Sequence, residues 1–524
     1  MTTLLSLLDK GYFPRELPPT FKTSAFATFA VATGPAWSNA SKGLWTRCSP
    51  HNLARPGGLR RPLKIPNPIS YFALAEIVAN NWTDIKAHTW RARLSASRPH
   101  IMKSASRAVV PRYRYGELPR LRTLRRRGAR YLLITDIGQF YPSIYTHAIP
   151  WALHTKAAVR TTLRTTAGRS LTGNRLDKAL QIMNDGQTHG IPIGPDASLV
   201  VAEILLSAID QELLDRHPAL IRGFRYVDDY ELSFTNLSDS EEILSELQGL
   251  LAEYGLQLNA RKTGITEVPQ AWEESWSVEL ARFLIRDASM PVAQRNDLVS
   301  LFSRAFEIAS GRPEDSVLRY AVARVQGLDV HPKGWRAFEN CLLSAASGDP
   351  STLAVVLGAL FTVANRGGHT ISKSPLSEII ESVIDIHARR GQGSEVSWAL
   401  WAALAWSLPL SDKAAELVST MEDNVVALLA LHADAAGVFT PGSLDITEWT
   451  NLANDPGVLQ SEHWLLAYEA NQQGWIPSPA VAKNAVFSAM SRAGIGFYDL
   501  AEAKPQFPMA GRGLLGGLLP DYYA

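Results

Sequence analysis

The chain is poor in cysteine, in long apolar runs and in net charge, and each shortage excludes a class of protein. Two cysteines in 524 residues cannot build a disulfide framework, and no Cys/His spacing is typical of a zinc site. No stretch of about 18 uncharged apolar residues is present, so we expect no transmembrane helix and no membrane partner. The short N-terminal apolar run is followed by Lys10 and Arg15, unlike a signal peptide. These features favour a reduced, cytoplasmic setting.

The charge balance is near neutral, but one segment is strongly basic. Lys and Arg number 52 against 50 Asp and Glu, so any basic surface must be local. Residues 107–130 contain nine arginines and a single acid, Glu117. A solvated surface is the alternative interpretation, but so one-sided a segment favours contact with the phosphates of a nucleic acid.

The sequence changes character near residue 285. Before it, YLLITDI predicts a buried strand, residues 223–234 predict two short strands around an acidic turn, and residues 196–214 and 240–256 predict helices. After it, runs rich in Ala, Leu and Trp predict successive helices. We therefore expect an α+β domain over 1–285, an all-α HEAT-like repeat domain over 286–500, and a flexible tail over 501–524.

Three segments of the first domain together indicate a metal-dependent site. Asp136 ends the apolar strand, THGIPIGPDAS (188–198) is a Gly/Pro-rich turn before a helix, and Asp228 and Asp229 form a carboxylate pair between two strands. Each feature alone is weak, since a DD pair is usually a solvated turn. Together, carboxylates on neighbouring strands can hold two Mg²⁺ ions that activate a primer hydroxyl and stabilise a leaving pyrophosphate.

These residues carry a resemblance to reverse transcriptases. Asp136 resembles the aspartate of the first palm motif, Gly190 to Pro195 the nucleotide-and-template loop, and Tyr226-Val227-Asp228-Asp229 the YxDD box. The resemblance implies palm and fingers over residues 1–285, dNTP as substrate, and catalytic aspartates at 136, 228 and 229. It implies two Mg²⁺ ions held by Asp136, Ile137, Asp228 and Asp229.

The same resemblance implies a nucleotide site next to the carboxylates. Tyr141 matches the bulky residue that excludes a 2′-hydroxyl, although packing beside Phe140 is the alternative. We expect the backbone N–H groups of Ile137 and Gly138 to face the triphosphate. The implied nucleotide-binding residues are Gly138, Gln139, Phe140, Tyr141, His189, Gly190, Arg125, Arg127 and Lys262. The implied nucleic-acid-binding residues are Arg112, Arg114, Arg120, Arg122, Arg126 and Arg130.

The chain is more specifically similar to the bacterial abortive-infection and defence-associated reverse transcriptases. YTHAIPW after the first motif, THGIPIG in the second and the GYFPRELPP opening carry this likeness. That family combines palm and fingers with an α-helical repeat domain in place of a thumb, acts in antiphage defence, and forms closed homo-oligomers, here a trimer or a hexamer. His189 stands where the glutamine of other reverse transcriptases would be, so templating can be unusual or absent.

Two other functions remain open, and so does the primer. A retron-like enzyme would copy its own structured RNA, and a catalytically idle protein would be a nucleic-acid-binding scaffold. The partner is RNA, single-stranded DNA or both, with a dedicated non-coding RNA as one candidate. Some relatives start synthesis on a protein hydroxyl, and Tyr522 and Tyr523 in the Gly-rich tail are our candidates, with docking of LLPDYYA on the helical domain as the alternative.

Overall fold

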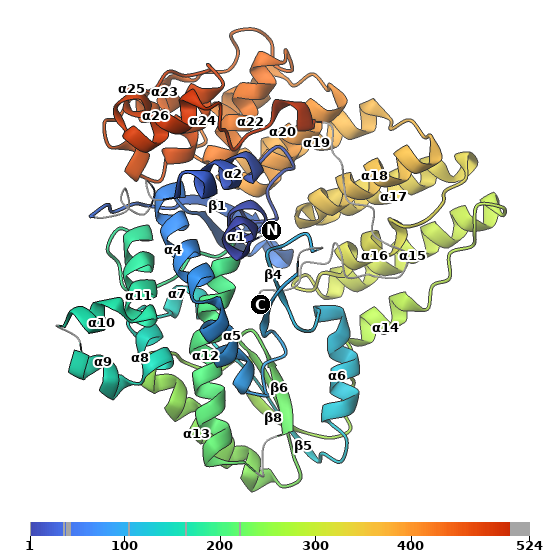
Figure 1. Cartoon of the computed structure of the whole chain (residues 1–524). Helices are drawn as coiled ribbons and strands as arrows, with labels where there is room; N and C mark the ends of the chain where they lie inside the picture. Colours follow the sequence, from blue (N-terminus) through green and yellow to red (C-terminus); the bar gives the residue numbers. More distant parts are fainter. Residues whose placement is uncertain are drawn as a thin grey trace.

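The fold of the first half is built around a four-stranded antiparallel sheet. The computed structural model describes residues 2–34, 37, 43–102, 105–162, 165–218 and 222–503. The sheet has the order β6-β7-β5-β8 and lies in the lower part of Figure 1. Its strands are β5 (Tyr131–Asp136), β6 (Arg222–Tyr226), β7 (Asp229–Phe234) and β8 (Gly264–Glu267). Two hairpins lie apart from it: β1 (Ser49–Ala54) with β2 (Arg60–Ile65), and β3 (Pro99–Ile101) with β4 (Val109–Pro111).

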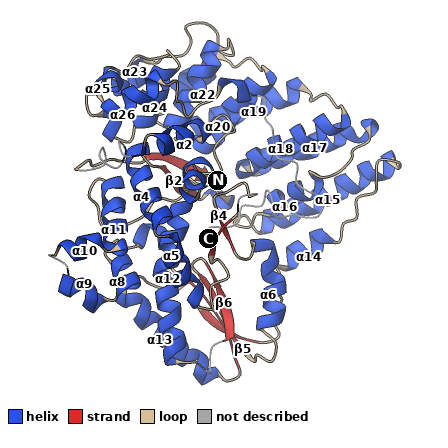
Figure 2. Ribbon diagram, viewed as in Figure 1, coloured by secondary structure: helices blue, strands red, loops and turns tan. Residues whose placement is uncertain are grey.

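Helices surround these strands. They are α1 (Thr3–Asp9), α2 (Ser24–Ala32), α4 (Pro68–Asn80), α5 (Trp82–Arg91), α6 (Leu118–Arg125), α7 (Phe140–Ser143), α8 (Ala148–His154), α9 (Lys156–Thr162), α10 (Thr166–Ser170), α11 (Thr172–Met183), α12 (Asp196–Arg216) and α13 (Leu237–Glu253). Short 3₁₀ turns span Pro56–Gly58 and Tyr115–Glu117. Figure 2 shows how few strands the molecule has beside its helices.

The two faces of the main sheet have different neighbours. Asp136 lies directly opposite Asp229, and Ile134 opposite Glu231, so these four side chains share one face. Ile134 is 40% exposed, so this face is partly open. On the other face Tyr230 and Leu232 are buried, and α13 packs across β5 and β7. The alternation of β7 therefore separates a partly open face that carries the acids from the core.

Helix α12 runs through the middle of this half. Most of its side chains are buried on every side, because it is apolar around most of its circumference. It follows Pro195 and has Asp196 in its first turn, where a negative charge is favourable. Helix α13 ends before Gly255, whose φ of +78° is accessible to glycine at little cost.

The second half is helical. Its helices are α14 (Ser275–Ala281), α15 (Pro291–Gly311), α16 (Val317–Val325), α17 (Pro332–Gly348), α18 (Leu353–Gly367), α19 (Lys373–Ala388), α20 (Gly393–Trp406), α21 (Asp412–Ser419), α22 (Asn424–Ala435), α23 (Thr447–Ala453), α24 (Trp464–Gln472), α25 (Pro479–Lys483) and α26 (Ala485–Arg492). The 3₁₀ turns of this half span Pro350–Thr352, Val458–Gln460 and Leu500–Ala503.

These helices stack in two layers. One layer packs α15, α17, α19 and α21 in order, and the other packs α16, α18, α20, α22 and α24. Each helix also packs on its neighbour in sequence, as in α15 with α16 and α19 with α20. In Figure 1 the stack curves from the right of the sheet over the top of the molecule. This arrangement is that of helix pairs stacked one on the next. The specific HEAT-like assignment stays a prediction.

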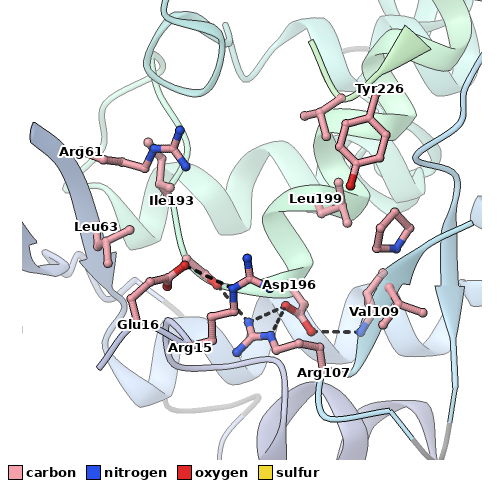
Figure 3. Close-up of a pocket in the computed structure, with 14 residues that line it drawn as sticks. Arg15, Glu16, Arg61, Leu63, Arg107, Val109, Ile193, Asp196, Leu199 and Tyr226 are labelled. Atoms are coloured by element: carbon pink, nitrogen blue, oxygen red, sulfur yellow. Dashed lines mark hydrogen bonds and ion pairs between the residues drawn. The ribbon is translucent and has the colours of Figure 1, made fainter. Parts of the chain in front are cut away.

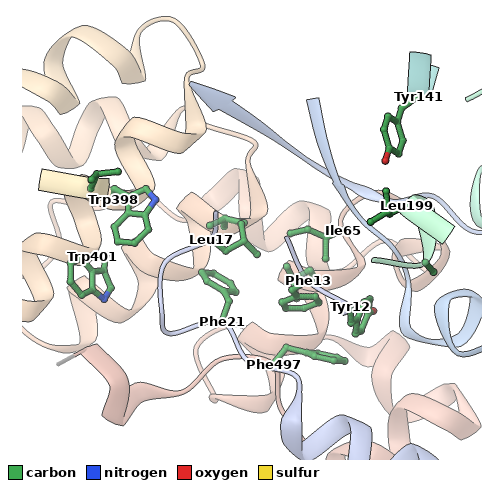
Figure 4. Packing of buried hydrophobic residues seen from close by; sticks show 14 of the residues in the cluster. Tyr12, Phe13, Leu17, Phe21, Ile65, Tyr141, Leu199, Trp398, Trp401 and Phe497 are labelled. Atoms are coloured by element: carbon green, nitrogen blue, oxygen red, sulfur yellow. The ribbon is translucent and has the colours of Figure 1, made fainter. Parts of the chain in front are cut away.

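The two halves share one hydrophobic core, and the chain's beginning packs on its end. Phe21 pairs with Tyr498 as an isolated β-bridge, and the Lys22 N–H donates to the Phe497 carbonyl at 2.9 Å. Figure 4 shows Tyr12, Phe13 and Phe21 gathered around Phe497. Tyr12 stacks on Tyr71 with ring centroids 4.3 Å apart and is fully buried. The N-terminal segment therefore closes the contact between the halves.

A buried carboxyl at this contact makes the stability of the fold depend on pH. Glu469 accepts a hydrogen bond from the Phe497 N–H, and burial raises its pKa to about 8. The folded state then holds a proton that the unfolded state has released, so this group makes stability fall as pH rises from about 4.5 to 8. Each pH unit costs roughly 1.4 kcal/mol. We expect Glu469→Gln to raise the melting temperature more at pH 8 than at pH 5; equal shifts at both would contradict the assignment.

The local expectations from the sequence are largely confirmed. Strand β5, the β6–β7 hairpin, α12 and α13 occur where their patterns predict them. Trp398 and Trp401 are buried in the core and Trp406 packs against it partly buried. Helices α1 and α2 were not predicted in the Pro-rich beginning. None of the described helices is both long and apolar enough to cross a lipid bilayer.

Candidate active site

The structure brings the three predicted aspartates together at one end of the main sheet. Asp136 is the last residue of β5 and Asp229 the first of β7, and they are direct partners across the two strands. Asp228 lies with Val227 in the two-residue turn that joins β6 to β7. The Ile137 N–H donates to the Asp228 carbonyl at 3.3 Å, which ties this turn to the end of β5.

Burial and mutual repulsion make the carboxylates difficult to ionise. Burial raises the pKa of Asp228 well above its usual value, and the charges of Asp229 and Asp136 raise it further. The pKa of Asp229 rises to about 6, first through burial and then through Asp136, while Lys262 and Arg122 partly offset the rise. A cation beside this group would relieve the cost of holding three negative charges together.

Two side chains of the segment after α13 already hold Asp136. The Lys262 ammonium lies 3.1 Å from Asp136 Oδ2, and Asn259 Nδ2 donates to the same oxygen at 3.0 Å. The Asn259 N–H also donates to the Asp136 carbonyl at 2.7 Å. Lys262 is more than half exposed, so its ammonium can move to another anion in the site. Lys262 therefore lies beside the carboxylates, and its expected contact with the triphosphate stays a prediction.

The oxygen atoms present fit a Mg²⁺ ion that takes some of its ligands from the protein and the others from the substrate. Asp228 Oδ1 is buried and has no hydrogen-bond partner, which leaves an oxygen lone pair available. Among the described residues, no three His, Cys, Asp or Glu side chains converge closely enough to enclose a metal ion by themselves. Mg²⁺ characteristically takes one or two carboxylates and completes its shell with water and phosphate oxygens. The residues present fit that pattern.

One expectation for the nucleotide site is wrong. The N–H of Gly138 donates to the Gln257 carbonyl at 2.9 Å and the N–H of Ile137 to Asp228, so neither faces outward. The backbone here pairs with the segment before Asn259, which the sequence pattern did not reveal. Gln139 has a φ of +47° and is exposed, so it remains at the surface next to Asp136.

Phe140 and Tyr141, which we expect next to the sugar of the bound nucleotide, lie beneath the 188–195 loop. Phe140 and Tyr141 are buried, and the Tyr141 carbonyl accepts from the Ile191 N–H at 3.0 Å. Gly190 has a φ of +83°, and a side chain there would press on the Pro142 carbonyl, 3.2 Å from an added Cβ. Glycine is therefore required for the 188–195 loop to lie on α7.

His189 is exposed and lies at the rim of this loop. Its ring packs against Tyr145 with centroids 5.0 Å apart, and its carbonyl accepts from Asn184 Nδ2. The neighbouring His147 pairs through Nδ1 with Asp177 at 2.6 Å. His147 therefore has a structural partner, whereas the His189 imidazole remains accessible.

The arginines of residues 107–130 divide into two groups. Arg122 and Arg126 both pair with Glu231 at 2.9 and 2.7 Å, and Arg107 pairs with the buried Asp196, so these three hold the fold. The others are exposed: Arg112, Arg114, Arg120, Arg125, Arg127 and Arg130. Arg112 also lies over the Trp90 ring at 5.3 Å. The run of basic residues in the sequence could not separate the two groups, because Glu231, the partner of Arg122 and Arg126, is over 100 positions away.

This division predicts different effects for neighbouring arginines. Arg125→Ala with Arg127→Ala should weaken nucleic-acid binding, each lost phosphate contact lowering the log–log salt slope by up to about 0.9 on a duplex. Arg122→Ala with Arg126→Ala should instead lower thermal stability, because Glu231 stays buried without a counter-ion. Filter binding at several salt concentrations and thermal melts would measure both. The control pair is Arg389→Ala with Arg390→Ala; a wild-type slope in the first variant would contradict the assignment.

A pocket that the sequence did not predict opens beside the YVDD turn. It lies between the N-terminal segment, β2, β4, the 188–195 loop and the catalytic hairpin (Figure 3). Arg15, Arg61 and Arg107 contribute cationic groups to its lining, and Tyr226 and Val227 close one side. The two adjacent arginines that begin the segment RRPLKIPNP (60–68) are the feature of the sequence that could have pointed to Arg61.

Comparison with known proteins identifies the class of this domain. Residues 57–284 match the family model described as reverse transcriptase (RNA-dependent DNA polymerase). The chain therefore carries a reverse transcriptase domain, and as an enzyme it is an RNA-directed DNA polymerase. No curated protein sequence matches the chain.

Two solved structures are similar to the chain at low identity. Apo telomerase from Candida tropicalis is 12% identical, with 72% of this chain and 74% of that chain covered and a TM-score of 0.34. Telomerase from Candida albicans in complex with a fragment of telomeric RNA is 11% identical, with 76% of this chain and 64% of that chain covered and a TM-score of 0.32.

Proposed function

We propose that the protein is a DNA polymerase of reverse-transcriptase type that acts in bacterial antiphage defence and joins dNTPs by two-metal nucleotidyl transfer. The observation that carries the polymerase assignment is the meeting of Asp136, Asp228 and Asp229 on one end of the main sheet. Asp136, the Ile137 carbonyl, Asp228 and Asp229 would hold the Mg²⁺ ions. When bound, these ions would activate the attacking hydroxyl and stabilise the leaving pyrophosphate.

The chain's own residues supply positioning and charge. Lys262, exposed and next to Asp136, is placed to pair with a triphosphate that enters over the carboxylates. His189 and Gly190 belong to the loop that packs on the buried Tyr141, and the exposed arginines of α6 provide a surface for phosphates. The template or product is RNA, single-stranded DNA or both.

The defence role is supported by the likeness of the motifs and by the helical stack that follows the domain. We propose a bacterial cytoplasmic setting and a closed homo-oligomer, for which the stacked helices offer broad surfaces. The alternative is a retron-like enzyme that copies its own structured RNA. An idle scaffold is the weaker alternative, because Asp228 and Asp229, whose raised pKa values show that their ionisation is costly, would then be kept beside Asp136 without a use.

Incubation of the pure protein with Mg²⁺ and labelled dNTPs would separate these functions. An untemplated polymerase should incorporate label with or without nuclease pretreatment. A templated enzyme should lose incorporation when its RNA is digested, and a scaffold should incorporate none in either arm. The Asp228→Asn variant would be the blank for each arm.

The primer remains a separate question. Tyr522 and Tyr523, the candidates for protein priming, lie outside the described residues. Tyr12 is fully buried and its hydroxyl donates to the Pro66 carbonyl at 2.6 Å, so this tyrosine cannot serve as primer in this fold. A nucleotide on Tyr522 or Tyr523, found by mass spectrometry and lost in Asp228→Asn, would support the tail as primer.

We expect Tyr141 to determine whether the enzyme uses deoxyribonucleotides or ribonucleotides. Replacing the ring with a smaller side chain should open space for a 2′-hydroxyl, so Tyr141→Val should raise rNTP use relative to dNTP by tenfold or more. Because Tyr141 is buried, some loss of stability is expected as well, up to about 3 kcal/mol. Tyr141→Phe is the control and should leave selectivity unchanged. Equal rNTP discrimination in all three proteins would place the gate elsewhere.

A further inference from the structure

The turn that carries Asp228 is strained. Val227 and Asp228 join two paired strands, and Val227 has a φ of +53°. A β-branched residue is a rare occupant of this left-handed region, where Gly, Asn or Asp is usual. Such a conformation persists only where surrounding groups hold it.

Both backbone groups of Val227 are held by buried side chains. The Val227 N–H donates to Ser97 Oγ at 2.7 Å, and its carbonyl accepts from Arg225 Nη1 at 2.7 Å. Ser97 and Arg225 are fully buried and come from different segments. The two hydrogen bonds therefore fix the strained residue from both sides of its Cα.

A buried charged network in turn fixes Ser97 and Arg225. Arg225 lies between Glu203 and Asp210 of α12 with contacts of 2.8 Å to each, and none of these three side chains has exposed surface. Glu203 also accepts from Ser97 at 2.7 Å and from Ser95 at 2.8 Å. Asp210 accepts from the Tyr230 hydroxyl at 2.9 Å. The central helix is thereby connected to the YVDD turn by direct polar contacts.

We propose that Ser97, Glu203, Asp210 and Arg225, which we term the turn bracket, are positioning residues that hold Val227 left-handed and so present Asp228 beside Asp136. The inference rests on the proposed polymerase function. If Val227 relaxed to the usual negative φ, the two-residue turn would change type and the Asp228 carboxylate would leave its place over the end of β5. The bracket touches neither substrate nor metal ligands through its charged groups; it acts through the backbone of one residue.

The test compares two buried serines. Ser97→Ala removes the acceptor for Val227, whereas Ser207→Ala removes a buried hydroxyl on α12 that donates to the Thr89 carbonyl and has no contact with the turn. We expect amide hydrogen exchange over residues 226–229 to rise tenfold or more in Ser97→Ala and not in Ser207→Ala. We expect kcat for dNTP incorporation to fall about tenfold in Ser97→Ala with KM little changed.

Arg225→Lys is a second variant that tests the same inference if Ser97→Ala fails to fold. It keeps a positive charge between the two acids but removes the forked donor that reaches Val227, so it should give the same exchange and kcat effects. Ser97→Thr retains the hydroxyl and should restore both. Faster exchange with wild-type kcat would overturn the positioning role, as would wild-type exchange in both Ser97→Ala and Arg225→Lys. Wild-type protein without any incorporation would refute the proposed function instead, and the exchange result would still stand.

Discussion

Asp228→Asn combined with Asp229→Asn should abolish nucleotide incorporation while the protein stays folded. Each removed carboxylate would weaken the hold on Mg²⁺, whose positive charge would stabilise the transition state, and one such electrostatic contact is commonly worth about 10²–10³ in rate. We therefore expect incorporation at least 10³-fold below wild type in a gel assay with labelled dNTPs.

The same double variant should melt no lower than the wild type. Burial and neighbouring acids raise the pKa values of both groups, so ionising them costs folding free energy that an amide does not. The increase in melting temperature over the wild type should grow from pH 5 to pH 8, as the wild-type carboxyls lose their protons. Glu267→Gln, an exposed acid in the same sheet, is the matched control and should change neither quantity. Substantial incorporation by the folded double variant would remove these residues from the active site.

Separating the halves of the chain should be equally damaging. Arg60 on β2 forms a two-pronged ion pair with Glu395 on α20, at 2.5 and 2.8 Å. His51 on β1 pairs with Asp423 at 2.8 Å, and the Trp464 indole donates to the Ile65 carbonyl at 3.3 Å. We expect residues 1–285 expressed alone to be unfolded or aggregated and to incorporate no nucleotide above background.

Two further measurements make this prediction decisive. Co-expression of residues 1–285 with residues 286–524 should restore soluble, active complex, because the missing contacts are then available. Glu395→Ala in the full chain should lower thermal stability, since Arg60 then loses its carboxylate partner at a half-buried site. An active, cooperatively melting 1–285 fragment would show that the predicted domain boundary is also a boundary of stability.

Local patterns predicted the elements that carry the aspartates. Strand β5 and the YVDD hairpin are short apolar runs broken by acids, and these patterns depend on neighbours in sequence. The register that sets Asp136 opposite Asp229 then follows once the two strands pair. The candidate site was therefore readable in outline from the chain alone.

What the sequence did not reveal depends on distant partners. Arg122 and Arg126 look like phosphate ligands until Glu231 folds against them, and Gly138 looks free until Gln257 pairs with it. Glu203, Asp210 and Arg225 each look like ordinary charges on a helix or strand. Only the packed structure shows that they meet, because periodicity carries no information about which side chains lie opposite one another.

The pairing of the chain's beginning with its end has a consequence for synthesis. Lys22 and Asp499 form an ion pair although they are 477 positions apart. At ribosomal rates of about 5–20 residues per second, Tyr12, Phe13 and Phe26 would await Phe497 for roughly 25 to 95 seconds. During that interval the parts of these rings that pack on Phe497 stay uncovered, so they are natural binding sites for chaperones. A chain whose translation stops early cannot complete this cluster, and the polymerase fold is thereby tied to the arrival of its last helices.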